Sequence, residues 1–231
     1  MYNNSFLGFY SGPWILIVFI AMIFGMITQA RIKSTYAKYS KVSNFGKVTG
    51  MQAARKILDR NGLQYINIVA IKGELSDHYD PTKKTIRLSE QVYYGYSIAD
   101  VSIAAHEVGH AIQHSKGYSF LTFRNSLIPL VNFASRSIYP LFIIGLFIAP
   151  FFIDIAIAVF AITVLFQIVT LPVELDASSR ALNNLEEGIL NRDEIYKGRK
   201  VLKAAAMTYV AAALFSIAQL LRLLSMQRSD D

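Results

Sequence analysis

Long apolar runs constrain the fold of this 231-residue chain more than any other feature. One run covers residues 13–30 without a charge, a longer apolar region extends over 127–171, and a last run covers 204–224. A helix rises about 1.5 Å per residue and the bilayer core is about 30 Å thick, so the first and last runs each match one crossing. The middle region is too long for one crossing and is interrupted by Pro150 and Asp154. We therefore predict a hairpin there and about four transmembrane helices in all.

The composition agrees with a membrane protein. The mean hydropathy is +0.36 and 53% of the residues are hydrophobic, which is high for a soluble chain. A cleaved signal peptide is the alternative interpretation of the first run. That run is longer than a usual signal-peptide core and no basic segment precedes it, so the sequence favours an uncleaved anchor.

The distribution of cations predicts the orientation of the chain. Residues 31–60 carry eight Lys or Arg and residues 172–203 carry six, whereas residues 1–12 and the turn around Asp154 carry none. The positive-inside rule then puts the N-terminus outside the cell membrane and both basic segments in the cytoplasm. The net charge of +7 does not indicate nucleic acid, because the cations flank apolar runs and form no aromatic-interleaved patch. The expected partner of these cations is the lipid bilayer with its anionic headgroups.

The segment His106-Glu107-Val108-Gly109-His110 carries the chemistry. On a helix, residues four apart share a face, so both imidazoles can bind one metal ion, and Glu107 can accept a proton from a water on that ion. Ser97 and Asp100 form a variant of the capping box upstream, and Gly117 offers a C-terminal stop. The alternative is a surface helix with two solvated histidines.

A third metal ligand has to come from elsewhere in the chain. The sequence has no cysteine, so a zinc site must use His, Asp, Glu and water. His114 lies one turn beyond the motif, where it cannot reach the same ion, and His78 is typical of a turn or strand entry. Glu174 follows the second helix of the hairpin and is the better candidate, in the first turn of a helix that we expect to start near Thr170 and Pro172. Its alternative role is to stabilise the dipole of that helix.

Asp176 lies about 200° further round the same helix than Glu174, so both are not expected on one ion. The membrane topology supports Glu174 independently. A ligand and the motif must lie on one side of the bilayer, and the two crossings of the hairpin satisfy this condition.

Taken together, these motifs resemble the YugP-like family of putative neutral zinc metallopeptidases of bacteria, which are membrane peptidases of the gluzincin type. The resemblance covers nearly the whole chain and is carried by residues 77–81, 86–89, 106–113 and 171–178. It implies His106, His110 and Glu174 as ligands of one zinc ion per chain, and Glu107 as general base. It also implies a strand over residues 84–89, which in gluzincins is an edge strand that binds extended peptide through backbone hydrogen bonds. The alternative for this segment is a short structural hairpin.

One position departs from the pattern of related heat-shock-type membrane peptidases. These enzymes have an Asp four residues after the ligand Glu, where it orients a histidine, whereas this chain has Ser178. Asp176 could orient the histidine in place of that Asp only if the helix were rotated so that Asp176 faced the motif. For the oxyanion of the reaction, Tyr79, His78 and Arg180 are all candidates.

The sequence therefore predicts a mainly α membrane protein with a small α+β gluzincin-like catalytic domain on the cytoplasmic side. The expected parts are an anchor (1–30), the catalytic domain (31–126), a transmembrane hairpin (127–171), the third-ligand helix (172–203) and a C-terminal transmembrane helix with its tail (204–231).

The predicted function is zinc-dependent hydrolysis of peptide bonds in peptides or proteins, including membrane proteins, in quality control or processing. The rival from another class is a membrane scaffold or assembly factor that keeps a metal site without proteolysis. A structural zinc usually has four protein ligands, and three plus an open position favour an enzyme. A zinc transporter is a weaker third interpretation, because the apolar runs lack paired His and Asp at midmembrane depth.

Overall fold

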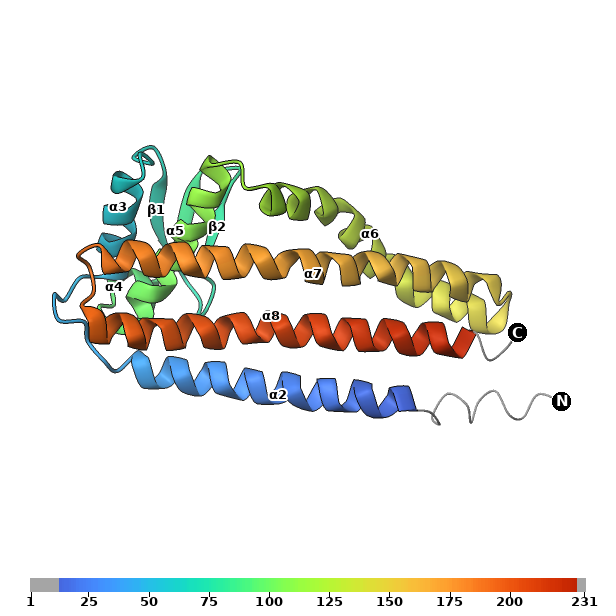
Figure 1. Ribbon diagram of the computed structural model, residues 1–231. Coiled ribbons are helices and arrows are strands. Elements are labelled where there is room, and N and C mark those ends of the chain that lie inside the picture. Colours follow the sequence, from blue (N-terminus) through green and yellow to red (C-terminus); the bar gives the residue numbers. More distant parts are fainter. Residues whose placement is uncertain (1–12, 228–231) are drawn as a thin grey trace. The chain divides into compact units, whose positions relative to one another are not determined.

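The computed structural model describes residues 13–227 and is dominated by helices (Figure 1). Within that range, four helices are long and apolar enough to cross a membrane by length and composition. They are α2 (Pro13–Tyr39), α6 (Ser119–Phe147), α7 (Phe151–Glu186) and α8 (Arg192–Gln227). The predictions for the extracellular N-terminus (1–12) and the last tail residues (228–231) lie outside the described residues.

The chain folds into two compact units, each built from segments that are separate in the sequence. The all-helical unit contains the described residues up to Thr28, then Phe123–Leu171, and the described residues from Thr208 onward. The mixed unit contains Gln29–Thr122 and Pro172–Met207, and it includes every strand of the described chain.

The hairpin of the all-helical unit turns where the sequence predicts. Helix α6 ends at Phe147 and α7 begins at Phe151, so the turn includes Pro150. The two helices approach closely at Gly145, where an added Cβ would lie 2.5 Å from a side-chain carbon of Ile153. Most large apolar side chains that the structure exposes, such as Phe147 and Phe151, lie in these long helices. Apolar surface of this extent suits contact with lipid better than contact with water.

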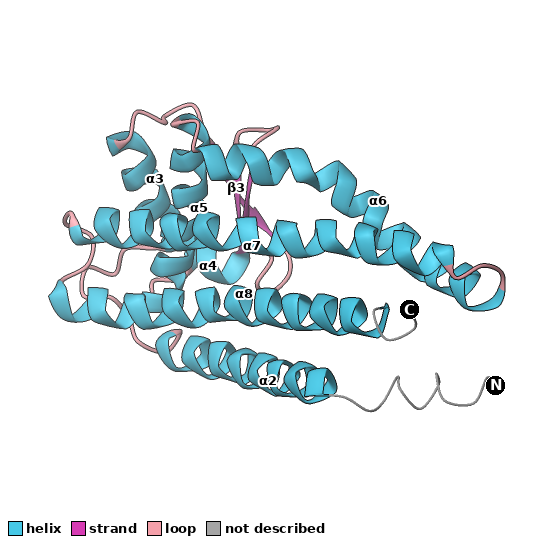
Figure 2. Cartoon of the chain, turned by 45° about the vertical axis from the view of Figure 1, so that its right-hand side comes forward, coloured by secondary structure: helices cyan, strands magenta, loops and turns pink. Residues whose placement is uncertain are grey.

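The mixed unit holds a small sheet (Figure 2). Its strands are β1 (Asn67–Ile71), β2 (His78–Asp80) and β3 (Thr85–Ser89), in the order β1-β3-β2. Strand β3 pairs with β1 in parallel, with Asn67 opposite Thr85, and with β2 antiparallel, with Tyr79 opposite Ile86.

The prediction of an edge strand over residues 84–89 is therefore wrong in one respect. A strand forms there, but it is the central one, and four of its five residues are buried. The alternation of apolar residues along β3 cannot reveal that β1 pairs with one of its edges while β2 pairs with the other. The sheet edges in the described structure are β1 and β2, so β2 carries the edge that could pair with a peptide.

Three shorter helices complete the mixed unit, namely α3 (Gly50–Arg60), α4 (Glu90–Tyr94) and α5 (Ile98–Ser115). Helix α5 begins with the expected capping box, in which Ser97 and Asp100 each accept the other's backbone N–H. It ends before Gly117, whose φ of +60° suits a residue without a Cβ. The predicted motif helix is confirmed at both ends.

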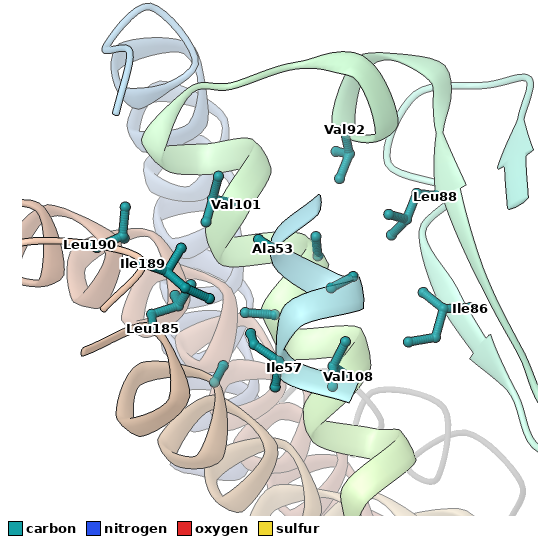
Figure 3. Packing of buried hydrophobic residues seen from close by; sticks show 14 of the residues in the cluster. Ala53, Ile57, Ile86, Leu88, Val92, Val101, Val108, Leu185, Ile189 and Leu190 are labelled. Atoms are coloured by element: carbon teal, nitrogen blue, oxygen red, sulfur yellow. The ribbon is translucent and has the colours of Figure 1, made fainter. Parts of the chain in front are cut away.

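The core of the mixed unit lies where α3, α5, the sheet and the end of α7 meet (Figure 3). Helix α3 contributes Ile57 and Leu58, β3 contributes Ile86 and Leu88, and all four side chains are completely buried. From α5, Val101 and Val108 face the same core, as does Leu185 of α7. The motif helix is thus held by apolar contacts along one face, which leaves its other face for polar residues.

Helix α7 differs from the sequence expectation. No new helix begins near Thr170 and Pro172, because α7 runs through Pro172 without a break. Proline removes one backbone hydrogen bond and is tolerated inside a helix where neighbouring groups and packing compensate. Here Val173 and Ala177 are completely buried just after it. Packing of the helix face therefore outweighs the local preference of proline for a helix start.

We expect that replacing Leu58 by alanine destabilises the mixed unit by about 2–5 kcal/mol, because a completely buried leucine leaves a cavity. Thermal unfolding of the detergent-solubilised protein measures this effect. Leu75→Ala is the matched control, since Leu75 is 60% exposed. Equal unfolding temperatures for the two variants would contradict the core described here.

Candidate metal centre

The two histidines of the motif lie on one face of α5. His106 and His110 are one turn apart, and their ring centroids are separated by 4.7 Å. Both side chains are only partly exposed. Helix geometry alone accounts for this pair, since residues four apart are neighbours on a helix surface.

Glu174 reaches the same point from α7. Its Oε2 lies 3.2 Å from Nε2 of His106 and 3.6 Å from Nε2 of His110. One ligand atom from each of the three residues lies within 4.8 Å of the others. Glu174 is 4% exposed, so its carboxylate has little access to water and depends on these partners.

These residues fit a zinc ion. Zinc–nitrogen and zinc–oxygen bonds of about 2.0–2.2 Å in tetrahedral geometry put neighbouring ligand atoms about 3.3–3.6 Å apart. The two Nε2–Oε2 distances of 3.2 and 3.6 Å are close to that spacing. Two imidazoles and a carboxylate also match the donor types that zinc takes at catalytic sites, which keep one position open.

A glycine allows the two helices to come this close. A Cβ on Gly109 would lie 2.5 Å from the carbonyl oxygen of Ala177 and 3.0 Å from its carbonyl carbon. The backbones of α5 and α7 are therefore in direct contact between the two histidines. Because Ala177 lies one turn after Glu174, this contact also fixes how far the carboxylate extends toward the histidines.

Both histidines have a partner on the other ring nitrogen. The hydroxyl of Ser178 lies 3.2 Å from Nδ1 of His106, and the amide oxygen of Gln113 lies 3.0 Å from Nδ1 of His110. These contacts turn both Nε2 atoms toward Glu174. Ser178 stands at the sequence position where related peptidases have an Asp. Although its side chain is shorter than that of Asp, its hydroxyl comes within hydrogen-bond distance of the His106 ring.

Asp176 points away from the histidine pair, as the angle around the helix predicts. Its Oδ2 accepts hydrogen bonds from Nε2 of Gln113 at 2.8 Å and from Nε of Arg180 at 2.6 Å. The guanidinium of Arg180 also lies 5.8 Å from the ring centroid of Tyr118. Arg180 is therefore engaged by Asp176 and is poorly placed for the oxyanion role considered from the sequence.

Glu107 is held next to the edge of the sheet. It is 8% exposed, and its Oε2 accepts a hydrogen bond of 3.0 Å from the backbone N–H of Tyr79 in β2. An antiparallel strand directs the N–H and C=O of one residue to the same side, so the Tyr79 carbonyl faces this edge too. One carboxylate oxygen of Glu107 is thus fixed at the outer edge of β2.

Tyr79 and His78 differ in their surroundings. The Tyr79 hydroxyl lies 2.9 Å from Nδ1 of His114, one turn beyond the motif. Burial, followed by the nearby Tyr65 and Asp80, raises the pKa of Tyr79 to about 12, so its hydroxyl keeps its proton near neutral pH. His78 is exposed, opens β2 as a strand-entry residue, and its ring bonds the Ser76 carbonyl.

The pKa of His110 is raised above its ordinary value of 6.5. Burial alone would lower it, but the hydrogen bond to Glu174, together with the charges of Glu107 and Glu174, outweighs burial. The metal-free site therefore tends to hold a proton where a cation would otherwise bind.

Sequence reasoning did not assign a role to Gln113, although it is the side chain that connects His110 to α7. It is completely buried, and its Nε2 also donates to the Val173 carbonyl at 2.7 Å. The available signal was a long polar residue three positions after His110, on the same face of the helix as the two histidines.

A histidine pair and a carboxylate with this spacing, in a chain with four apolar helices of membrane length, define the kind of site that zinc peptidases use. The family model "Putative neutral zinc metallopeptidase" matches residues 14–228, and the chain belongs to this family. It is 46% identical over 211 residues to the "Putative membrane protease YugP" of Bacillus subtilis (strain 168), which covers 90% of this chain and 94% of the relative. No solved structure matches the chain significantly.

The resemblance stated from the sequence motifs is thereby confirmed at the level of the family. The name of the relative and the four apolar helices together indicate a membrane protein.

We expect Gly109→Ala to weaken zinc binding about tenfold or more. An added methyl group must push α5 from the Ala177 carbonyl, and such overpacking costs about 1–3 kcal/mol. Chelator competition on the purified protein measures the affinity. Gly25→Ala in α2 is the control, because a Cβ there meets nothing within 4 Å. Unchanged zinc affinity in Gly109→Ala would argue against a site formed by this helix contact.

Zinc affinity should fall as the pH is lowered, beginning above pH 6.5. The raised pKa of His110 means that its imidazole is already protonated at that pH in the metal-free protein, and zinc must displace this proton. Competition titrations between about pH 6 and pH 8 test this expectation. An affinity that stays constant over the range would exclude histidine as a ligand.

Proposed function

We propose that this protein is a membrane-embedded zinc metallopeptidase that hydrolyses peptide bonds. One zinc ion per chain would be held by His106, His110 and Glu174, with Glu107 as general base. The single observation that carries the proposal is the convergence of two Nε2 atoms on the Glu174 carboxylate at 3.2 and 3.6 Å. Membership in a family of zinc metallopeptidases supports the same conclusion.

A zinc ion in this site would supply Lewis acidity, lowering the pKa of a water toward about 7 and polarising the scissile carbonyl. Glu107 follows His106 in the chain and has one carboxylate oxygen fixed by the Tyr79 N–H. Its other oxygen remains for the proton of the attacking water. Glu107 would then pass this proton to the leaving amine, as general acid–base catalysis requires.

The edge of β2 is the proposed place for the substrate backbone. The carbonyl of Tyr79 faces this edge beside Glu107 and can accept a hydrogen bond from a peptide N–H. Of the three candidates for stabilising an oxyanion we favour the Tyr79 hydroxyl, because it keeps its proton and belongs to the residue whose N–H holds Glu107.

We further propose that the site faces the cytoplasm of a multi-pass protein. The two basic segments, residues 31–60 and 172–203, both belong to the mixed unit that contains the site. The positive-inside rule assigns such segments to the cytoplasmic side. Peptides and membrane or membrane-proximal proteins are then the accessible substrates, which fits quality control or processing.

Glu107→Gln should abolish proteolysis and leave zinc binding intact. The amide cannot accept the proton, which is expected to lower the rate by about 10²–10⁴-fold, while the proposed zinc ligands are unchanged. Cleavage of casein and of a reconstituted membrane protein, measured together with bound zinc, tests this prediction.

Glu90→Gln is the matched control, because Glu90 is an exposed glutamate in the first turn of α4. Activity that survives Glu107→Gln would count against this mechanism. Bound zinc without any cleavage by the wild-type protein would favour the alternative, a membrane scaffold that keeps a metal site.

A further inference from the structure

Gln113 is a buried amide that uses all of its polar groups at the metal centre. Its side chain is completely buried, which is unusual for glutamine and costly unless its donors and acceptor are bonded. The amide nitrogen lies 2.7 Å from the Val173 carbonyl and 2.8 Å from Oδ2 of Asp176. The amide oxygen lies 3.0 Å from Nδ1 of His110.

The chemistry of these partners fixes the orientation of the amide. A backbone carbonyl and a carboxylate can only accept hydrogen bonds, so the NH₂ group of Gln113 must face Val173 and Asp176. The amide oxygen then faces His110 and can only accept. Nδ1 of His110 must therefore carry the ring proton.

This proton decides which nitrogen of His110 can bind a metal. With the proton on Nδ1, the lone pair is on Nε2, the atom that lies 3.6 Å from Glu174. The opposite tautomer would put a hydrogen where the cation belongs. Asp176 maintains the arrangement because Arg180 bonds the same Oδ2 at 2.6 Å and holds the carboxylate against Gln113.

We infer that Gln113 is a positioning residue that sets the tautomer and the ring orientation of His110, and that Asp176 sets the orientation of Gln113. The inference rests on the proposed metal site. It also connects the two ligand-bearing helices, because Val173 and Asp176 flank Glu174 in α7. A single side chain thus connects His110 of α5 to the turn of α7 that carries Glu174.

The test compares zinc affinity, by chelator competition on the full-length detergent-solubilised protein, between wild type and Gln113→Met. Methionine has a similar length but no strong acceptor, so we expect affinity to fall about 10–100-fold. Nitrogen-15 NMR of the histidine side chains in the zinc-free protein, at a pH high enough for the His110 ring to be neutral, should show that His110 in Gln113→Met loses the uniform Nδ1–H form of the wild type. Gln91→Met, at an exposed position of α4, should change neither quantity.

Asp176→Ala distinguishes positioning from a general packing role at 113, because it keeps the Gln113 side chain and removes one of the two acceptors that fix its amide. We expect zinc affinity to fall in this variant too, by less than in Gln113→Met, because the Val173 carbonyl still holds the amide nitrogen. Wild-type zinc affinity in either variant would overturn the inference, as would a uniform Nδ1–H form of His110 in Gln113→Met. A wild-type protein without zinc affinity would instead contradict the proposed function, and the inference with it.

Discussion

The direct contact between the backbones of α5 and α7 at Gly109 and Ala177 is the constraint on which the site depends. Without a side chain at Gly109, the helices approach until Glu174, one turn away, meets both histidines. The same approach brings Ser178 to His106 and Gln113 to the α7 backbone. A cluster of three candidate ligand side chains and their supporting bonds therefore follows from one close helix contact and two regular helices.

The buried polar groups at this contact explain why a divalent cation suits the site. Glu174 is almost completely buried, and its carboxylate contacts the two imidazoles, with a hydrogen bond to His106 and a longer contact of 3.6 Å to Nε2 of His110. Burying a carboxylate is costly unless it is paired with a charge of opposite sign. A proton on His110 supplies part of that charge, which is why its pKa is raised. A zinc ion would supply the charge at the same place and leave both imidazoles neutral.

The elements that the sequence predicted well are those encoded by local pattern. The capping residues Ser97 and Asp100 define the start of the motif helix, and Gly117 marks its end. Pro150 lies in the turn of the apolar hairpin. The strand order was not predictable, because β1 and β2 both fit beside β3 as far as alternation of side chains is concerned. The continuity of α7 through Pro172 was missed for a related reason, since the packing that compensates for proline comes from residues distant in the sequence.

By itself, the sequence determined the membrane-length helices and the pairing of His106 with His110 on one helix face, because periodicity and spacing along one chain encode them. It made Glu174 the preferred third candidate through the membrane topology and the family resemblance. Only the tertiary structure decided that Ser178 reaches His106, that Gln113 rather than a carboxylate reaches His110, and that the Tyr79 backbone holds Glu107. The approach of α5 and α7 brings Ser178 to His106, and the position of β2 at the sheet edge brings the Tyr79 backbone to Glu107. Within α5, the conformation of the Gln113 side chain turns its amide oxygen toward His110. Such contacts depend on distances of a few tenths of an ångström, which packing of the folded chain sets and local sequence does not.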